Sequence, residues 1–204
     1  MRILRKSFYN GNTLQVAQDL LGCFLVVLPG GKSRTTNAAH ANSTKRVCKF
    51  KIVEVEAYNG PNDLASHASQ GRTERNSIMF GKPGIIYVYF TYGMHYMLNI
   101  VTEAKDYPAA VLIRAVEPIS HNVERIAHNT NGPAKLTKIL GIDKFFNGLP
   151  IYTKKYGLWV EGGDEKFKNS QIKKATRIGV DYAGKYKDKK WRFYIKGNIF
   201  VSKK

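Results

Sequence analysis

Five segments of strand length, separated by turn residues, constrain the fold of this chain more than any other feature. Each carries Val, Ile, Leu or aromatic residues, either in one run or alternating with polar residues, which is typical of β-strands. Only a short turn with Tyr92-Gly93 separates the third from the fourth, so these two predict a β-hairpin. The five predicted strands are Cys23–Leu28, Phe50–Tyr58, Ile85–Phe90, Tyr96–Val101 and Ala110–Glu117.

Helical patterns are fewer. Apolar residues recur at helical spacing after Asn12 or Thr13, either of which can cap a helix, and Gly22 ends the pattern. A second helical pattern covers much of residues 119–141 and is interrupted by Asn131-Gly132-Pro133. Residues 62–81 predict a loop or a short helix. The last quarter of the chain predicts two closing strands, at Trp191–Ile195 and Ile199–Val201.

These elements predict an α+β (mixed α/β) fold. A chain of 204 residues with 43% hydrophobic residues suits one compact domain, here residues 1–204. We expect a curved, mainly antiparallel sheet, peripheral helices and a protruding β-hairpin. Residues 29–46 are mostly Gly, Ser, Thr, Asn, Ala and Lys, which predicts a flexible insertion between two strands.

The charge balance indicates a polyanionic partner. Lys and Arg number 33 against 15 Asp and Glu, which leaves a net charge of +18. Nucleic acid is the first expectation, and a ribosome or a membrane surface is the alternative that charge alone does not separate. No apolar run approaches the roughly 18–20 residues of a membrane helix. The first residues carry no signal-peptide pattern, so we expect a bacterial-type cytoplasmic protein.

Two acids share one face of a predicted strand. Glu54 and Glu56 lie two residues apart, and Tyr58 follows on the same face. A carboxylate on a rigid strand beside an aromatic ring can serve as a general base. Two ordinary acids on a solvent-facing strand would give the same pattern, and the residues alone leave both interpretations open.

Tyrosines gather in the predicted hairpin. Tyr87, Tyr89 and Tyr96 can pack on the sheet or contact a ligand, whereas Tyr92 falls at the turn, where an aromatic ring is exposed. Aromatic and apolar side chains can enter DNA between base steps or stack on unpaired bases. His67 stands alone among polar residues, and the histidines and cysteines lack the spacing of a metal site, so no metal and no cofactor are expected.

A succession of short motifs resembles one known family. The longest are residues 54–58, with the sequence EVEAY, and residues 111–118, with the sequence VLIRAVEP. The shorter ones are Gly60-Pro61, Gly71-Arg72, Lys82-Pro83-Gly84, Tyr87-Val88-Tyr89, Tyr92-Gly93-Met94 and Gly132-Pro133-Ala134-Lys135-Leu136. In this order they closely resemble the alkyladenine (3-methyladenine, methylpurine) DNA glycosylases. The similarity covers residues 12–28 and 50–141 and continues more thinly to Ser202.

The resemblance implies a monofunctional DNA glycosylase of base excision repair. Such an enzyme hydrolyses the N-glycosidic bond of a flipped-out alkylated purine. The expected substrate is 3-methyladenine, and 7-methylguanine, hypoxanthine and ethenoadenine are further candidates. The implied partner is double-stranded DNA with damaged purines, bound by a monomer without cofactor or membrane.

The resemblance also implies the role of eight residues. Glu56 would be the catalytic carboxylate that activates water, and Arg114 would help to hold it. Tyr58, His67 and Tyr89 would sandwich and read the flipped base, and Asn99 would disfavour normal guanine. The last two lie outside the base pocket: Tyr92 would enter the duplex, and Arg72 would lie near the DNA backbone.

The sequence leaves two alternatives open. A non-catalytic basic nucleic-acid-binding protein, such as a ribosome-associated domain, explains the charge and the aromatic residues. It does not explain a carboxylate at position 56 next to Tyr58, His67 and Arg114. A degenerate glycosylase that binds lesions without cutting them is the other alternative, and the presence of Glu56 argues against it.

Overall fold

The structure is a computed structural model that describes residues 1–28, 47–119, 130–164 and 166–204. Within these residues one sheet contains eight strands. The predicted flexible insertion at 29–46 and part of the second helical pattern lie outside the described residues. The strands are β1 (Phe24–Val27), β2 (Cys48–Asn59), β3 (Ile86–Thr91), β4 (His95–Val101), β5 (Ala109–Pro118), β6 (Leu158–Glu161), β7 (Ile172–Ala175) and β8 (Arg192–Ile195).

The sheet is antiparallel throughout its recorded pairs, with the order β3-β4-β5-β2-β1-β6. Strand β2 is its centre. It pairs with β5 along one edge, and along the other it pairs first with β1 and then, over Glu54–Glu56, with β8. An irregularity in the pairing with β5 falls between Ile52 and Val55, where β2 changes its partner on the other edge. This mostly antiparallel sheet with few helices confirms the predicted α+β class.

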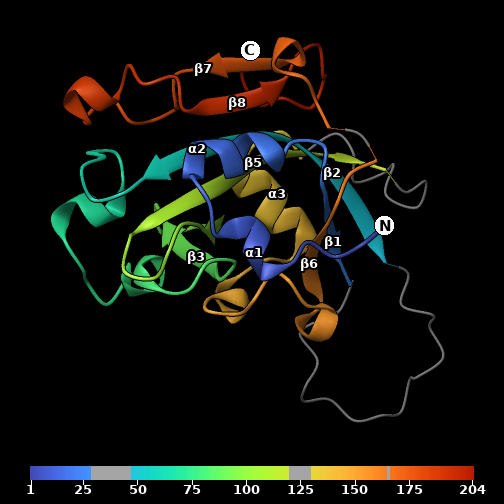
Figure 1. Cartoon of the computed structure of the whole chain (residues 1–204), viewed down its shortest axis with the longest axis horizontal. Coiled ribbons are helices and arrows are strands. Elements are labelled where there is room, and N and C mark those ends of the chain that lie inside the picture. Colours follow the sequence, from blue (N-terminus) through green and yellow to red (C-terminus); the bar gives the residue numbers. More distant parts are fainter. Residues whose placement is uncertain (29–46, 120–129, 165) are drawn as a thin grey trace.

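Three α-helices accompany the sheet among the residues that the structure describes: α1 (Lys6–Tyr9), α2 (Thr13–Asp19) and α3 (Pro133–Leu140). The Asn12 side chain accepts hydrogen bonds from two backbone amides at the start of α2, as the sequence predicts for a cap. Helix α2 packs on β2 and β5, and α3 packs on β4 and β5 (Figure 1). Short 3₁₀ helices lie in the connections: η1 (His67–Gln70), η2 (Ser77–Phe80), η4 (Lys144–Phe146), η5 (Lys154–Tyr156), η6 (Asn169–Gln171) and η7 (Gly184–Tyr186).

The main hydrophobic core lies between the sheet and these helices. Val53, Val55 and Ala57 of β2 are fully buried in it, together with apolar residues of α2, α3 and the neighbouring strands. None of the helices within the described ranges is both long enough and apolar enough to cross a membrane. The core therefore occupies one face of β2 and leaves the face with Glu54 and Glu56 to other neighbours.

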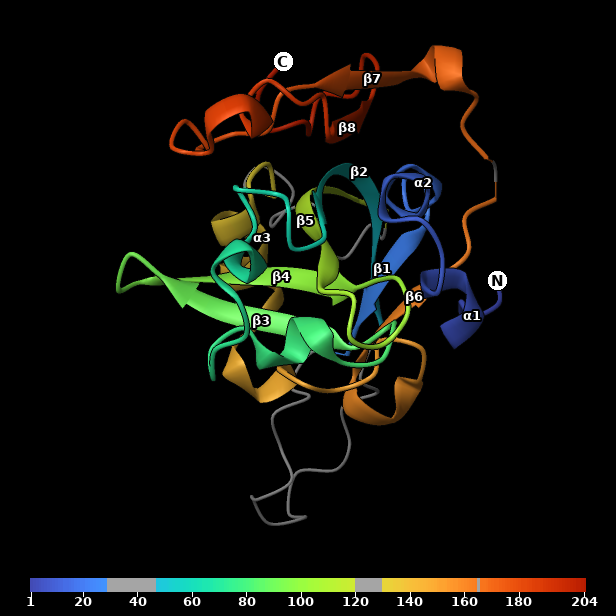
Figure 2. The ribbon, with the colours of Figure 1, turned by 60° about the vertical axis from the view of Figure 1, so that its left-hand side comes forward.

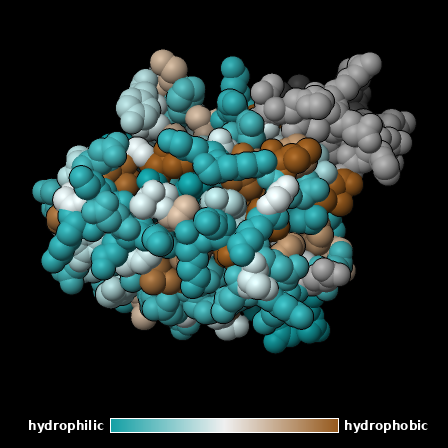
Figure 3. Space-filling view, turned by 90° about the horizontal axis from the view of Figure 1, so that it is seen from above, coloured by the Kyte–Doolittle hydropathy of each residue, from teal (hydrophilic) through white to brown (hydrophobic). Residues whose placement is uncertain are grey.

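The last part of the chain extends the sheet beside β2, and its Ile178 and Ser202 amides bind the two acids on that other face. In Figures 1 and 2, β7 and β8 lie along one side of the molecule, next to β2. Figure 3 shows the outer surface on this side as mainly hydrophilic. Exposed lysines contribute to it, namely Lys173, Lys174, Lys185, Lys187, Lys189, Lys190 and Lys196.

Two details differ from the sequence-based expectation. Both faces of β2 are buried around Glu54 and Glu56, so the interpretation of these residues as solvent-facing acids is wrong. Residues Ile199–Val201 do not form a closing strand, since Ile199 and Phe200 lie in a turn, and β8 pairs instead with β7, which the sequence did not predict. The hairpin of β3 and β4 is present as predicted, and its tip projects from the rest of the molecule (Figure 2).

Candidate active site

A cavity of about 360 Å³ lies between the β3–β4 hairpin, β5 and the segment Ile178–Tyr182. Its volume is in the range of small-molecule sites, and its lining is mostly aromatic and apolar with a few polar groups. Six of the eight residues to which the resemblance assigns a role line it: Tyr58, His67, Tyr89, Tyr92, Asn99 and Arg114.

Glu56 lies directly behind the wall of this cavity. Its side chain has no exposed surface, and its three polar partners, Tyr58, Arg114 and Ile178, all line the cavity. The Tyr58 hydroxyl donates to Oε2 at 3.0 Å, and the Ile178 amide donates to Oε1 at 2.8 Å. The Arg114 guanidinium is 3.3 Å from Oε1. A carboxylate offers about four lone-pair sites, so Glu56 can accept one further hydrogen bond.

The surroundings of Glu56 act on its pKa in opposite directions. Burial raises the pKa, whereas Arg114, the Ile178 amide and the Tyr58 hydroxyl lower it, and the net result is a raised pKa. Burial and the neighbouring Glu56 also hold the pKa of Tyr58 well above its ordinary value. Tyr58 therefore stays protonated and donates to the carboxylate.

Arg114 joins two carboxylates. Its Nη1 is 3.3 Å from Glu56, and its Nε is 3.4 Å from Oε1 of Glu54. Glu54 is also fully buried and pairs with Arg192 at 2.8 Å. The two acids of β2 thus belong to one buried network of charges with two guanidinium groups.

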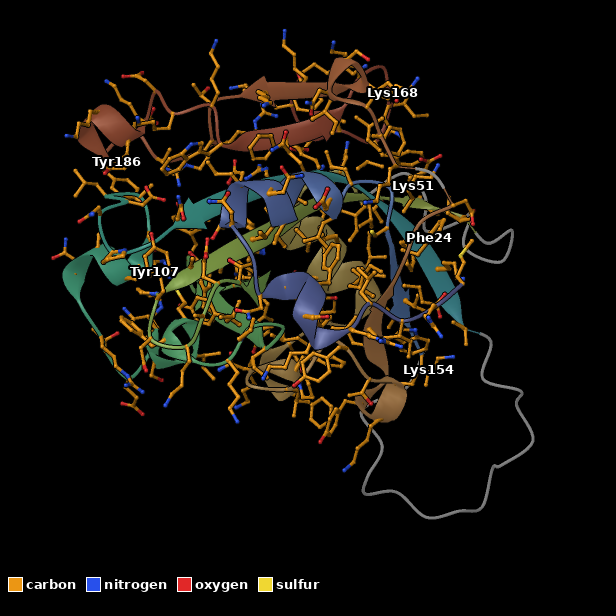
Figure 4. All side chains as sticks on the ribbon, viewed as in Figure 1. Phe24, Lys51, Tyr107, Lys154, Lys168 and Tyr186 are labelled. Atoms are coloured by element: carbon orange, nitrogen blue, oxygen red, sulfur yellow. The ribbon has the colours of Figure 1, made fainter. Side chains whose placement is uncertain are left out.

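The Arg177 guanidinium packs on the ring of Tyr58. It is 4.9 Å from the centroid of Tyr58 and 5.1 Å from that of Trp191. It donates to both carboxylate oxygens of Asp63, at 2.5 and 2.8 Å, in a pair with fully buried side chains. Tyr186, labelled in Figure 4, packs against the same small apolar cluster as Tyr58, and its carbonyl accepts a hydrogen bond from Arg177.

Three aromatic rings meet on another wall. Nδ1 of His67 is 3.0 Å from the hydroxyl of Tyr87, and the His67 ring contacts that of Tyr89 edge-on at 4.5 Å. The Arg75 guanidinium lies 5.3 Å from the Tyr89 centroid. Burial and then the charge of Arg75 lower the pKa of His67, so its imidazole is neutral at neutral pH. Burial also raises the pKa of Tyr87 to about 12.

The side chain of a buried asparagine forms hydrogen bonds that stabilise the loop with His67. The Asn76 side chain donates to the carbonyls of His67 and Gly71 at 2.9 and 2.8 Å, and it accepts from the amide of Thr73 at 2.7 Å. Asp63 closes the start of the same loop by accepting from the amides of Asn59 and Ala65. Residues 63–76 are thus fixed by side-chain to backbone hydrogen bonds that resemble Asx turns.

Asn99 lies on the floor of the cavity and is almost fully buried. Its Nδ2 donates to the carbonyls of Tyr87 and Met97, each at 3.3 Å. These two bonds fix the orientation of the amide group, since both its N–H donors are used within β3 and β4.

Tyr92 stands at the tip of the hairpin. Its side chain is 83% exposed, and its backbone adopts a left-handed φ of 51°. Both features are uncommon for a bulky aromatic residue and point to a local function. Met94 in the same turn is 68% exposed.

Arg72 is the one predicted residue that lies outside the cavity and apart from Glu56. It is on the exposed surface, with its guanidinium 5.6 Å from the ring centroid of Phe80. This position leaves it free of the pocket and accessible to a large partner.

Several contributors to the site were missed by the sequence analysis. The Ile178 amide is a main-chain donor, and no residue type signals such a group. Tyr182, which also lines the cavity, lies in the part of the chain where the resemblance is thin. Arg177 and Asp63 are 114 residues apart, so no local sequence pattern predicts their ion pair.

No three metal-ligating side chains gather in the part of the chain that the structure describes. The polar groups of the cavity are instead hydroxyl, amide, imidazole and guanidinium groups around one carboxylate. A buried carboxylate beside an aromatic cavity can accept a proton from water and can stabilise a developing positive charge.

Comparison with known proteins identifies the class to which this fold and site belong. The family model described as "Methylpurine-DNA glycosylase (MPG)" matches residues 7–199. A protein of Clostridium novyi is 42% identical over the full length of both chains, and one of Methanocella arvoryzae is 44% identical over 100% of this chain and 98% of its own length. One of Legionella pneumophila is 40% identical over both full lengths. All three carry the name "Putative 3-methyladenine DNA glycosylase".

The chain belongs to the methylpurine-DNA glycosylase family. It is a DNA glycosylase, a hydrolase of DNA repair that acts on DNA. This membership confirms the resemblance drawn from the motifs, and it favours the enzyme over the non-catalytic binder.

Proposed function

We propose that this glycosylase hydrolyses the N-glycosidic bond of an alkylated purine held in the aromatic cavity, with Glu56 as the catalytic carboxylate. One observation carries the proposal. Glu56 is a fully buried carboxylate whose three polar partners all line that cavity. A purely structural role for Glu56 would not explain why all its polar partners line a cavity of ligand size.

Glu56 acts on a water molecule in the proposed step. It accepts a proton from the water, whose oxygen forms a bond to C1′ of the deoxyribose. The C1′–N bond breaks, and its electron pair leaves with the purine nitrogen. The sugar passes through an oxocarbenium-like state, as in glycoside hydrolysis, and the negative charge of Glu56 stabilises it.

Access to Glu56 depends on Tyr58. The Tyr58 hydroxyl covers Oε2 of the carboxylate in the free protein. When the Tyr58 ring stacks on a base, a small rotation frees this oxygen for the water. Arg114 and the Ile178 amide keep the other oxygen in place.

The aromatic walls favour cationic bases. N3- and N7-alkylated purines carry a positive charge, which is attracted to the rings of Tyr58, Tyr89 and His67 by about 0.5–2 kcal/mol per contact. Such a base is also a good leaving group because it departs neutral. We therefore propose 3-methyladenine, which the names of the relatives also mention, and 7-methylguanine as substrates. Hypoxanthine and ethenoadenine are neutral and depend on hydrogen bonds or protonation instead.

The substrate base must leave the duplex before it reaches the cavity. Tyr92 projects from the hairpin tip at the rim of the cavity, so we propose that it enters the vacated stack. The net charge of +18 supplies phosphate contacts, among them Arg72, and makes DNA binding strongly dependent on salt. Because one chain builds the whole site, a monomer is sufficient.

A base-release assay tests the proposal. Methylated duplex DNA and a duplex with one hypoxanthine are incubated with the protein and a chelator, and free bases and strand breaks are measured. We expect release of 3-methyladenine and an intact strand with an abasic site, and we expect no release by Glu56→Gln. Tight DNA binding without release from either substrate would contradict the proposal.

A further inference from the structure

Glu54 has no role in the proposed chemistry, although it is as deeply buried as Glu56. Its two oxygens have three partners. The Arg192 guanidinium donates to Oε1 at 2.8 Å, the Ser202 amide donates to Oε2 at 2.7 Å, and Nε of Arg114 is 3.4 Å from Oε1. A buried carboxylate with this many partners is unusual in a chain with few acids, so we asked what function it serves.

Arg114 links Glu54 to the active site. Its guanidinium reaches Glu54 through Nε at 3.4 Å and Glu56 through Nη1 at 3.3 Å. A guanidinium is planar, so contacts on two of its nitrogens fix its orientation. Glu54 and Glu56 therefore form ion pairs with two nitrogens of the same guanidinium.

Two segments that are distant from Glu54 in sequence bind Glu54 and Arg192: Thr176 and residues 202–203. Arg192 of β8 donates to the carbonyl of Thr176 at 2.8 Å and to that of Lys203 at 2.7 Å. Ser202 supplies its amide to Glu54, and its hydroxyl is 3.5 Å from Nη2 of Arg114. Residues 202–203, which are not part of the cavity lining, thus complete the network.

We propose that Glu54 is a positioning residue that, anchored by Arg192 and the Ser202 amide, holds Arg114 against Glu56. The inference rests on the proposed function, because it assigns Glu54 to the support of the same carboxylate. Two adjacent buried carboxylates repel each other, and apolar residues often stabilise an interior at least as well as buried ion pairs do. The acid at position 54 is thus explained by the orientation of Arg114 better than by stability.

The sharpest test removes the backbone hydrogen bond from residue 202 to Glu54. Ser202→Pro deletes the amide that donates to Glu54, and it replaces no charged side chain. It also removes the hydroxyl 3.5 Å from Nη2 of Arg114, a loss that Ser202→Ala shares. We expect a fall of about tenfold in the single-turnover excision rate, since small misplacements in active sites have effects of this size or larger. Binding of lesion DNA should stay within twofold of wild type. Ser202→Ala, which keeps the amide, should lose less activity, and Lys204→Pro is the control for a nearby proline.

The pH profile separates positioning from structural damage. The charged and titratable groups that face Glu56 are Glu54, Tyr58, Tyr89, Arg114 and Tyr182. Arg114 lowers the pKa of Glu56, so a displaced Arg114 lets that pKa rise. The acid limb of the Ser202→Pro rate profile should therefore move to higher pH. A lower melting temperature or rate without this movement would indicate a merely structural role and overturn the inference.

Glu54→Gln gives a second test. It removes the charge that anchors Arg114 and should reduce the excision rate by at least tenfold. Glu161→Gln is the matched control, because Glu161 is also a buried acid paired with a base, Lys49 at 2.7 Å, but lies outside the cavity lining. Its rate should equal that of wild type, and equal losses in both variants would contradict the inference.

The two proposals fail in different ways. An inactive Glu56→Gln together with wild-type rates and profiles in Ser202→Pro and Glu54→Gln would overturn only the positioning role of Glu54. An active Glu56→Gln would instead overturn the proposed role of Glu56 itself.

Discussion

Arg177 packs its guanidinium on the ring of Tyr58 at 4.9 Å from the centroid, and Asp63 neutralises it with two hydrogen bonds. Tyr58 in turn donates to Glu56. The wall of the cavity is thus supported by a buried ion pair between the loop after β2 and the segment after β7. Folding of these two distant segments and assembly of the site are therefore coupled.

Loss of this ion pair should destabilise the whole protein. Asp63→Asn leaves the Arg177 charge buried without a counter-charge, so we expect a loss of about 3–5 kcal/mol in the free energy of unfolding. Glu161→Gln should cost only about 1 kcal/mol, because its partner Lys49 is partly exposed. Urea unfolding of both variants measures the difference, and similar losses would contradict this explanation.

The pH dependence of excision should report the raised pKa of Glu56. The general base must be ionised, so the rate should fall as the pH drops through a value above the ordinary range of glutamate. A rate–pH profile under single-turnover conditions with a permanently cationic base, such as 7-methylguanine, measures it. An acid limb at or below the ordinary value would contradict the account.

The raised pKa of Glu56 also makes the stability of the protein depend on pH. A carboxyl with a raised folded-state pKa stabilises the protein below its unfolded pKa, and this stabilisation is lost as the pH rises through the folded value. Glu56→Gln cannot titrate. The unfolding free energy of wild type relative to Glu56→Gln should therefore decrease as the pH rises through this window, and an increase would have the wrong sign.

We expect Tyr92 to help extrude the base from the duplex and to take no part in bond hydrolysis. Tyr92→Ala should reduce excision from a paired lesion at least tenfold, since the unstacking of a base costs a few kcal/mol. Excision of the same lesion from a single strand should change little. Because the residue is exposed and has a left-handed backbone, unfolding should change by less than about 1 kcal/mol. Equal losses on both substrates would point to a role in the pocket instead.

His67 should respond to the charge of Arg75. Burial and Arg75 together lower its pKa, so Arg75→Ala should raise the His67 pKa part of the way towards its ordinary value. NMR titration of the His67 ring in wild type and Arg75→Ala measures this directly. An unchanged or lower pKa in Arg75→Ala would show that Arg75 has no such influence.

The sequence predicted the parts of the fold that depend on local patterns. The strongest example is the β3–β4 hairpin, whose alternating aromatic and apolar residues and central Gly93 agree with the observed pairing of Thr91 with His95. Strand β7 was missed because two of its four residues are exposed lysines, and the four-residue strand β6 was missed as well. Ile199 has the residue type of a strand, but it lies in a turn and is 76% exposed.

The candidate site could be predicted only where its residues fall within motifs. Glu56, Tyr58 and Arg114 were identified and lie together. Their supports come from far along the chain: the Ile178 amide is 122 residues from Glu56, and the Ser202 amide is 148 residues from Glu54. Burial of both faces of β2 depends on these late segments, and no local periodicity contains that information.

The most direct test of the account is the single-turnover excision rate of Glu56→Gln, measured next to wild type on duplex DNA with one 7-methylguanine. General base catalysis contributes typically 10²–10⁴-fold, so we expect a loss of at least about 10²-fold. Affinity for the same duplex should remain within a few fold of wild type. Excision by Glu56→Gln at the wild-type rate would contradict the central claim that this buried carboxylate activates the attacking water.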